Sequence, residues 1–326
     1  MVDGLWSVVP HPSRVARLPT IDYRPLTLFL TFVLLTTTSC ANVVNYTDPE
    51  GPRFAVQAHP ADQRTALKVV TFNIRYAREI DSAIVVLMQD PELHDADVIA
   101  LEEMDEDGVQ RIATALGMSY VYYPAVHHPV DKKDFGPALL ARWPIEDDRK
   151  VILPHLSLSR RAQRVAVTGR VNIGGEMVQL YAVHLANSLE VSYAGQKDQL
   201  DALLNDADSV GLPVIIAGDF NSYEVAGEAL NRGYSWPTSG VVASHHGLRL
   251  DHILYRGLGT APDSAAVVHD VRGASDHHPV WAMVPVKQAP KEPIPVSTPR
   301  VNVLLASGLI ASTARVASSI STPALL

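Results

Sequence analysis

The sequence predicts an α/β domain built around mixed β-sheets. Three observations lead there. Strand-like segments outnumber helix-like ones, and both tight hairpins and longer crossover connections join them. The segment DVIALEE (97–103) contains an uninterrupted apolar run, which is typical of a strand buried on both faces. Only two stretches carry the period of an amphipathic helix, so helices should cover the sheets rather than form the core.

The first 41 residues predict an export signal. Basic residues precede the apolar stretch LTLFLTFVLL (26–35), and small polar residues follow it. This is the order found in export signals, and the apolar part is shorter than the ~20 residues that a membrane-spanning helix needs. Acylation of Cys40, as in a bacterial lipoprotein, would anchor the protein to a membrane, whereas cleavage after Ala41 would release it. A buried N-terminal helix is the third interpretation.

The domain itself is expected over residues 66–286. Residues 42–65 are polar, contain proline and lack a period, which predicts a linker. LKVVTFNIR (67–75) is rich in β-formers and predicts the first strand, and DVIALEE the second. Between residues 107 and 117, apolar side chains spaced i, i+3, i+4 and i+7 predict one face of a helix that ends at a glycine.

The middle of the domain predicts a hairpin and a second helix. PALLARWPI (137–145) has the composition of a short strand. RVAVTGRVNI (164–173) and EMVQLYAVHL (176–185) both alternate and are joined by two glycines, which is a strong hairpin signal. Leucine and alanine residues over 200–207 then fall on one helical face.

Three further strands close the domain: PVIIAGDFN (213–221), RLDHILY (249–255) and HHPVWAMVPV (277–286). Residues 287–326 begin with a proline-rich run and continue with small and apolar residues. This composition predicts a disordered tail.

Charge and cysteine content narrow the function classes. The formal net charge of −8 argues against a protein held on nucleic acid by a broad basic surface, although nucleic acid stays open as a substrate. A single cysteine excludes an intrachain disulfide framework and any zinc site built on several thiolates.

Polar side chains gather where the predicted strands end. A lone acid or histidine at a strand end is usually a turn former or a satisfied polar neighbour. Six such positions in one domain are different, because ligand sites in parallel and mixed sheets lie at strand ends. The residues are Asn73, Glu102, Glu103, His184, Asp219, Asn221, Asp251, His252, Asp276 and His277.

Together these residue types predict phosphoester hydrolysis. Carboxylates gathered in one cleft would repel each other unless a cation compensated them. Carboxylate and amide oxygens suit a hard ion, namely Mg²⁺, with Mn²⁺ or Ca²⁺ as alternatives. Such an ion neutralises charge on a phosphoryl group while a carboxylate activates water.

The chain from about residue 67 to residue 286 resembles the endonuclease/exonuclease/phosphatase superfamily. The most specific matches are GDFN (218–221) followed by SDHHPV (275–280). The other matching stretches, in the family's order, are TFNIR, DVIALEEMD, FGPALLARWPI, YAVHL and LDHIL. The resemblance implies a four-layer α-β-β-α sandwich of two packed mixed sheets, with the site at one end of the sheets.

The resemblance also implies roles for single residues. Glu103, Asn73 and Asp276 correspond to the metal-side residues, with Glu103 as principal ligand. The catalytic set comprises Asp219 for the attacking water, Asn221 for the phosphate, His277 for the scissile phosphate, Asp251 as its partner, and His184 for the leaving oxygen.

Three positions depart from the family pattern. Glu102 stands where glutamine is common, Pro137 replaces an asparagine, and no clear acid accompanies His184. Outside the pattern, Arg160, Arg161 and Arg164 could meet a phosphate, although a solvated start of a strand is the simpler interpretation.

The resulting hypothesis is an exported, metal-dependent phosphoesterase of the cell envelope. Its substrate would be nucleic acid, a phospholipid head group or an inositol phosphate. We expect a monomer, with membrane association only through the N-terminal segment. The alternative is a catalytically inactive cell-envelope binding protein that keeps the fold.

Overall fold

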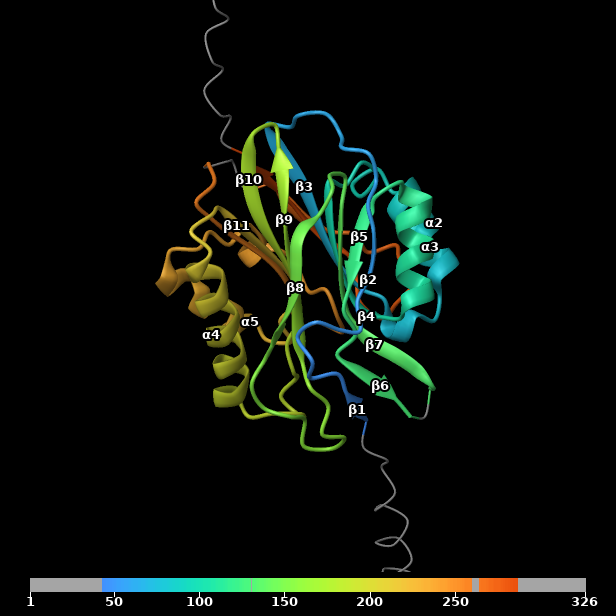
Figure 1. Ribbon diagram of the computed structural model, residues 1–326, viewed down its shortest axis with the longest axis vertical. Coiled ribbons are helices and arrows are strands. Elements are labelled where there is room, and N and C mark those ends of the chain that lie inside the picture. Colours follow the sequence, from blue (N-terminus) through green and yellow to red (C-terminus); the bar gives the residue numbers. More distant parts are fainter. Residues whose placement is uncertain (1–42, 130, 260–263, 287–326) are drawn as a thin grey trace, which may run out of the picture. The chain divides into compact units, whose positions relative to one another are not determined.

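A computed structural model describes residues 43–129, 131–259 and 264–286 (Figure 1). These residues form two β-sheets that pack face to face, with helices on the two outer faces, which confirms the expected four-layer sandwich. The predicted export signal (1–41) and proline-rich tail (287–326) lie outside the described residues. Within the described part, no helix is both long and apolar enough to cross a membrane.

The larger sheet has nine strands in the order β1-β6-β7-β4-β3-β14-β13, and β5 joins it by pairing with β7 and β2. The bounds are β1 Val44–Asn45, β2 Phe54–Val56, β3 Ala66–Asn73, β4 Val98–Met104, β5 Ser119–Tyr122, β6 Val126–His128, β7 Lys133–Ala141, β13 Ala265–Val267 and β14 Val280–Pro285. The helices α2 (Ile80–Gln89) and α3 (Glu106–Leu116) cover its outer face.

The smaller sheet has five strands in the order β12-β11-β10-β9-β8. The bounds are β8 Glu146–Ile152, β9 Val165–Ile173, β10 Glu176–His184, β11 Val214–Asp219 and β12 Asp251–Arg256. The helices α4 (Tyr193–Ser209) and α5 (Tyr223–Gly227) pack on its outer face. The remaining elements are short 3₁₀ turns: η1 Arg75–Ala77, η2 Glu228–Arg232 and η3 Pro237–Gly240.

The predicted hairpin is present in the smaller sheet. The strands β9 and β10 pair antiparallel from Ile173 and Glu176 outward. Gly174 and Gly175 link them with φ values of 62° and 98°, a region that only glycine adopts without strain. The predicted helix over 107–117 is α3, and Gly117 ends it in the left-handed conformation.

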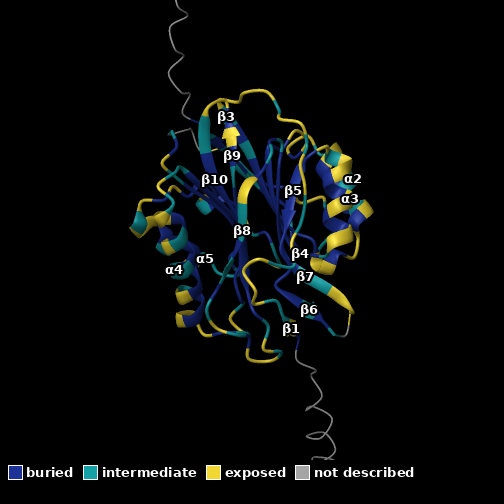
Figure 2. Ribbon diagram, in the orientation of Figure 1, coloured by how far each residue is buried: buried dark blue, intermediate teal, exposed yellow. Residues whose placement is uncertain are grey.

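Strand alternation divides most of the apolar side chains between three large clusters of buried residues. Along β3, Leu67 and Val69 face the other sheet, whereas Val70 and Phe72 face the helices. Along β10, Leu180 likewise points between the sheets, whereas the next residue, Tyr181, points toward α4. The central strands are accordingly buried, whereas the edge strand β8 and the outward faces of the helices are partly exposed (Figure 2).

The expectation of a linker over residues 42–65 is wrong for the part that the structure describes. In that segment β1 pairs antiparallel with β6, and β2 pairs antiparallel with β5. Gln57 also exchanges two hydrogen bonds with the backbone of Ile145. The segment lacks a period because its strands are only two and three residues long and draw their pairing from the neighbouring chain.

Candidate active site

The candidate site lies where side-chain rows between the two sheets turn from apolar to polar. The rows that carry the inter-sheet core continue to Asn73 on β3, Glu102 on β4, His184 on β10, Asp219 on β11 and Asp251 on β12. The pairing of neighbouring strands places these side chains next to one another. His184 lies opposite Asp219, and Asp219 lies opposite Asp251. Asn73 lies opposite Glu102 in the other sheet.

A β-bulge in β4 turns two successive carboxylates toward the site. The pairing of β4 with β7 shifts between Leu101 and Met104, both of which pack against the helices. One extra residue therefore stands between them, and Glu103 takes a φ of 60°. Glu102 is fully buried and accepts a hydrogen bond from the Thr71 hydroxyl at 3.1 Å. Burial and the charges of nearby acids raise its pKa well above the usual value.

Asp219 lies at the centre of the polar cluster. One carboxylate oxygen accepts a hydrogen bond from the Asn73 amide at 3.0 Å, and the other accepts one from the Asn221 backbone at 2.8 Å. The Nε2 atom of His184 lies 3.5 Å from the same carboxylate. Burial, followed by the charge of Asp251, raises the pKa of Asp219 to about 7. Its carboxylate can therefore gain or lose a proton near neutral pH.

His277 is paired with Asp251 beside this carboxylate. Its Nδ1 atom lies 2.9 Å from Asp251 Oδ2, and its Nε2 atom lies 3.9 Å from Asp219 Oδ2. Burial opposes a charge on this ring, but the carboxylate of Asp251 outweighs it and raises the pKa of His277 to about 10. In contrast, burial and nearby cations lower the pKa of His184 well below its usual value. The site thus holds one cationic and one neutral imidazole.

Two of the three residues expected on the metal side, Glu103 and Asp276, line the same cavity as Asp219, whereas Asn73 is hydrogen-bonded to Asp219. Glu103 is partly buried and accepts a hydrogen bond from the Tyr76 backbone at 3.1 Å; desolvation raises its pKa. Asp276 pairs with the half-exposed Arg75 at 3.4 Å. These two partly buried carboxylates, together with the amide of Asn73, are an oxygen donor set suited to a hard divalent cation. The residues present therefore fit such an ion.

The described part of the chain contains two groups of three side chains that could hold a metal ion. Within each group, the possible ligand atoms lie within 4.8 Å of one another. Asp219, Asp251 and His277 form the first, in which His277 is hydrogen-bonded to Asp251 and lies 3.9 Å from Asp219. His245, His246 and Asp276 form the second. The ring of His245 stacks on His277 with 4.2 Å between centroids, whereas His246 is exposed.

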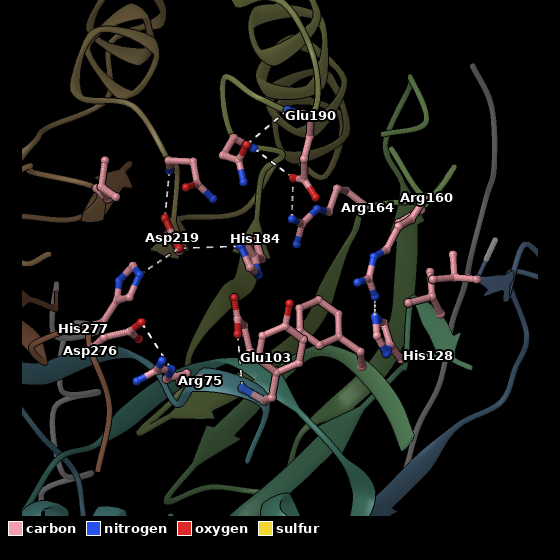
Figure 3. A pocket seen from close by; sticks show the side chains of 18 of the residues that line it. Arg75, Glu103, His128, Arg160, Arg164, His184, Glu190, Asp219, Asp276 and His277 are labelled. Atoms are coloured by element: carbon pink, nitrogen blue, oxygen red, sulfur yellow. Dashed lines mark hydrogen bonds and ion pairs between the residues drawn. The ribbon is translucent and has the colours of Figure 1, made fainter. Parts of the chain in front are cut away.

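Most of the predicted site residues line a single cavity of about 400 Å³ (Figure 3). Six of the eight predicted site residues line it: Glu103, His184, Asp219, Asn221, Asp276 and His277. Asn73 and Asp251 stand behind them and hold Asp219 and His277. Glu103, Asp219 and Asp276 thus share one cavity.

The structure adds cavity residues that the sequence had not assigned. Arg160 and Arg164 line the cavity, whereas the exposed Arg161 does not. The interpretation of this cluster as a solvated start of a strand is therefore wrong for Arg164, which is buried. Tyr76 and Phe135 also line the cavity, in contact with each other. Their spacing carries no periodic signal, and only the arginine cluster could have been found in the sequence.

Comparisons with known proteins agree with this geometry. A family model described as "Endonuclease/Exonuclease/phosphatase family" matches residues 70–277, more than half of the chain. A search of curated proteins found no significant match. Among solved structures, the chain is similar to an endonuclease/exonuclease/phosphatase from Beutenbergia cavernae, with 20% identity and a TM-score of 0.56 over 68% of this chain and 72% of that one.

Two similar structures have more specific names. D. rerio TDP2 complexed with a single-strand DNA product is 18% identical, with a TM-score of 0.53 over 68% of this chain and 99% of that one. Sphingomyelinase C from Streptomyces griseocarneus is 18% identical, with a TM-score of 0.52 over the same shares. At these identities the likeness shows the fold.

Proposed function

The chain belongs to the endonuclease/exonuclease/phosphatase family, and we propose that it is a phosphoesterase that depends on a divalent metal ion. The observation that carries the proposal is the arrangement around Asp219. A carboxylate with a pKa of about 7, a cationic imidazole and a neutral imidazole face one cavity at the end of the two sheets. Such groups can promote phosphoester hydrolysis, the carboxylate by accepting a proton from water and the cationic imidazole by stabilising negative charge on the phosphoryl oxygens.

Asp219 would take the proton from the attacking water. Its Asn73 and Asn221 hydrogen bonds fix the carboxylate, and its pKa lets it accept a proton near neutral pH. His277 would face the phosphoryl oxygens with a positive charge that Asp251 maintains. His184 is beside Asp219 on the cavity wall, where its ring can contact the leaving oxygen.

Glu103, Asn73 and Asp276 would hold the cation. Mg²⁺ suits these oxygen donors, and Mn²⁺ or Ca²⁺ are the alternatives. When bound, the ion would neutralise negative charge on the phosphoryl group. The ion pair between Arg75 and Asp276 would then break. The half-exposed Arg75 side chain could turn into solvent.

The test is hydrolysis of bis(p-nitrophenyl) phosphate with Mg²⁺ by purified variants. His277→Ala and Asp219→Asn should each lower kcat by at least ~10²-fold while the thermal melting curve stays cooperative. His59→Ala removes an exposed imidazole far from the site and serves as the control. Wild-type turnover by both site variants would refute the proposal. A Mg²⁺-dependent thermal shift without turnover of any phosphoester would favour the binding-protein alternative.

We also propose that the protein is exported to the cell envelope, as a monomer. The support is the basic, apolar and small-residue order of residues 1–41. Cell fractionation of wild type and Cys40→Ser distinguishes the two processing routes. Loss of membrane attachment in the variant supports acylation of Cys40, whereas an unchanged soluble envelope fraction supports cleavage. Retention of both proteins in the cytoplasm would refute export.

A further inference from the structure

The cavity has a basic wall that the proposed hydrolysis does not use. Figure 3 shows Arg164 and Arg160 on the opposite side of the cavity from His277 and Asp276. Arg164 is 9% exposed, and its Nη2 atom donates to Glu190 at 2.6 Å. Its Nε and Nη1 atoms have no hydrogen-bond partner among the described residues. A buried guanidinium with two unpartnered nitrogens is costly unless a ligand accepts their hydrogen bonds.

Arg160 is held in place by a neutral ring. Its Nη1 atom contacts the Nε2 atom of His128, whose Nδ1 atom lies 2.6 Å from Asp131. Burial and the charge of Arg160 lower the pKa of His128. The imidazole therefore accepts from Arg160 without cancelling its charge. This contact fixes the direction of the guanidinium and leaves it able to bind an anion.

The aromatic faces in the cavity are already occupied by cations. The guanidinium of Arg164 lies 5.8 Å from the ring centre of Phe135, and that of Arg78 lies 5.2 Å from the ring centre of Tyr76. A quaternary ammonium head group would need such free aromatic faces and would be repelled by the arginines. A multidentate anion such as phosphate, whose several oxygens can each accept a hydrogen bond, suits paired guanidinium groups instead.

We propose that Arg160 and Arg164 bind a second, non-scissile phosphate, so that the substrate is a phosphodiester with another phosphate near the scissile bond. This inference rests on the proposed function, because the scissile phosphate must occupy the Asp219 and His277 side of the cavity. The second phosphate could belong to a nucleic acid or to a phosphorylated inositol. Both sources present the same anion to the two arginines.

The experiment uses two substrate pairs that differ only in the second phosphate. The first is the dinucleotide TpT and its 5′-phosphorylated form pTpT, and the second is glycerophosphoinositol and its 4-phosphate. In wild type, kcat/KM should be at least ~10-fold higher for the phosphorylated member of one pair. Arg160→Gln and Arg164→Gln should each bring that ratio toward one. Arg161→Gln removes an exposed neighbouring charge outside the cavity and should leave the ratio unchanged.

The outcomes separate this inference from the proposed function. No turnover by wild type of bis(p-nitrophenyl) phosphate or of any of the four compounds would contradict the proposed function, whereas turnover of bis(p-nitrophenyl) phosphate alone would overturn only the second-phosphate site. Turnover without preference for a second phosphate, or a preference that survives both substitutions, would overturn the second-phosphate site alone. The pair that shows the preference identifies the source of the phosphate. If Arg164→Gln melts early because its charge is buried, Arg160→Gln decides, since that side chain is less buried.

Discussion

Replacing His252 tests how the layer behind the active site is built. His252 is fully buried and lies among Phe220, Tyr223 and Trp236. The indole of Trp236 donates to its Nδ1 atom at 3.3 Å, and its Nε2 atom lies 3.1 Å from the carbonyl of Arg249. These contacts require one neutral tautomer. Burial lowers the pKa of His252 to about 4.

The sign of the effect follows from proton uptake. As the pH falls through 6.5, the imidazole of the unfolded chain becomes protonated, but that of the folded protein stays neutral until about pH 4. The unfolded state therefore binds more protons in this window, and stability falls with pH. Between pH 7.5 and pH 5 the loss from this one group is about 2 kcal/mol, since a pKa difference of one unit corresponds to about 1.4 kcal/mol.

Urea denaturation of wild type and His252→Gln at pH 7.5 and pH 5 measures the effect. The variant should lose about 2 kcal/mol less than wild type over this interval, whatever its stability at pH 7.5. His59→Gln, which removes an exposed imidazole, is the control. Parallel losses in wild type and His252→Gln would show that the buried neutral ring is not the source. Because His252 faces away from the cavity, both variants should retain hydrolysis.

Four further predictions concern the site. Asp251→Asn removes the partner of His277 Nδ1 and should lower kcat by ~10²–10⁴-fold in the diester assay. Glu102→Gln keeps the shape of a buried acid and should retain kcat/KM within ~3-fold. In Gly218→Ala the new Cβ would lie 2.0 Å from the Val183 carbonyl oxygen, so urea denaturation should show a loss of at least ~2 kcal/mol. Removal of divalent metal with EDTA should abolish turnover by at least ~10²-fold, and added Mg²⁺ should restore it.

Much of the fold follows from strand alternation in the sequence. The paired runs around Gly174 and Gly175 predict β9 and β10, and the apolar runs before Asp219 and after His277 predict β11 and β14. The helix α2 was not predicted. Its sequence IDSAIVVLMQ contains β-branched residues on several faces and has no side-chain N-cap, so its local signals do not favour a helix. Packing of its buried residues against the larger sheet stabilises it instead.

The identity of the site residues was more predictable than their orientation. Acids and imidazoles at strand ends are visible in the sequence, and parallel registry brings His184 beside Asp219. Alternation alone would send Glu103 toward the helices, because Leu101 points there. The β-bulge that turns the Glu103 side chain toward the cavity instead depends on the pairing of β4 with β7. Burial of Arg164 likewise depends on Glu190, a residue that only tertiary folding brings within 2.6 Å.

The dipeptide Asp-His occurs twice near the site, and the backbone decides what each copy does. Asp251 and His252 are consecutive residues of β12, so their side chains point to opposite faces of the sheet. Asp251 reaches His277, while His252 enters the aromatic layer. Asp276 and His277 precede β14, where no strand geometry separates them, and both line the cavity. The same two residue types therefore give a neutral buried imidazole in one place and a cationic one in the other. Accordingly, His252→Gln should change the pH dependence of stability and leave catalysis intact, whereas His277→Ala should lower kcat and leave the fold intact.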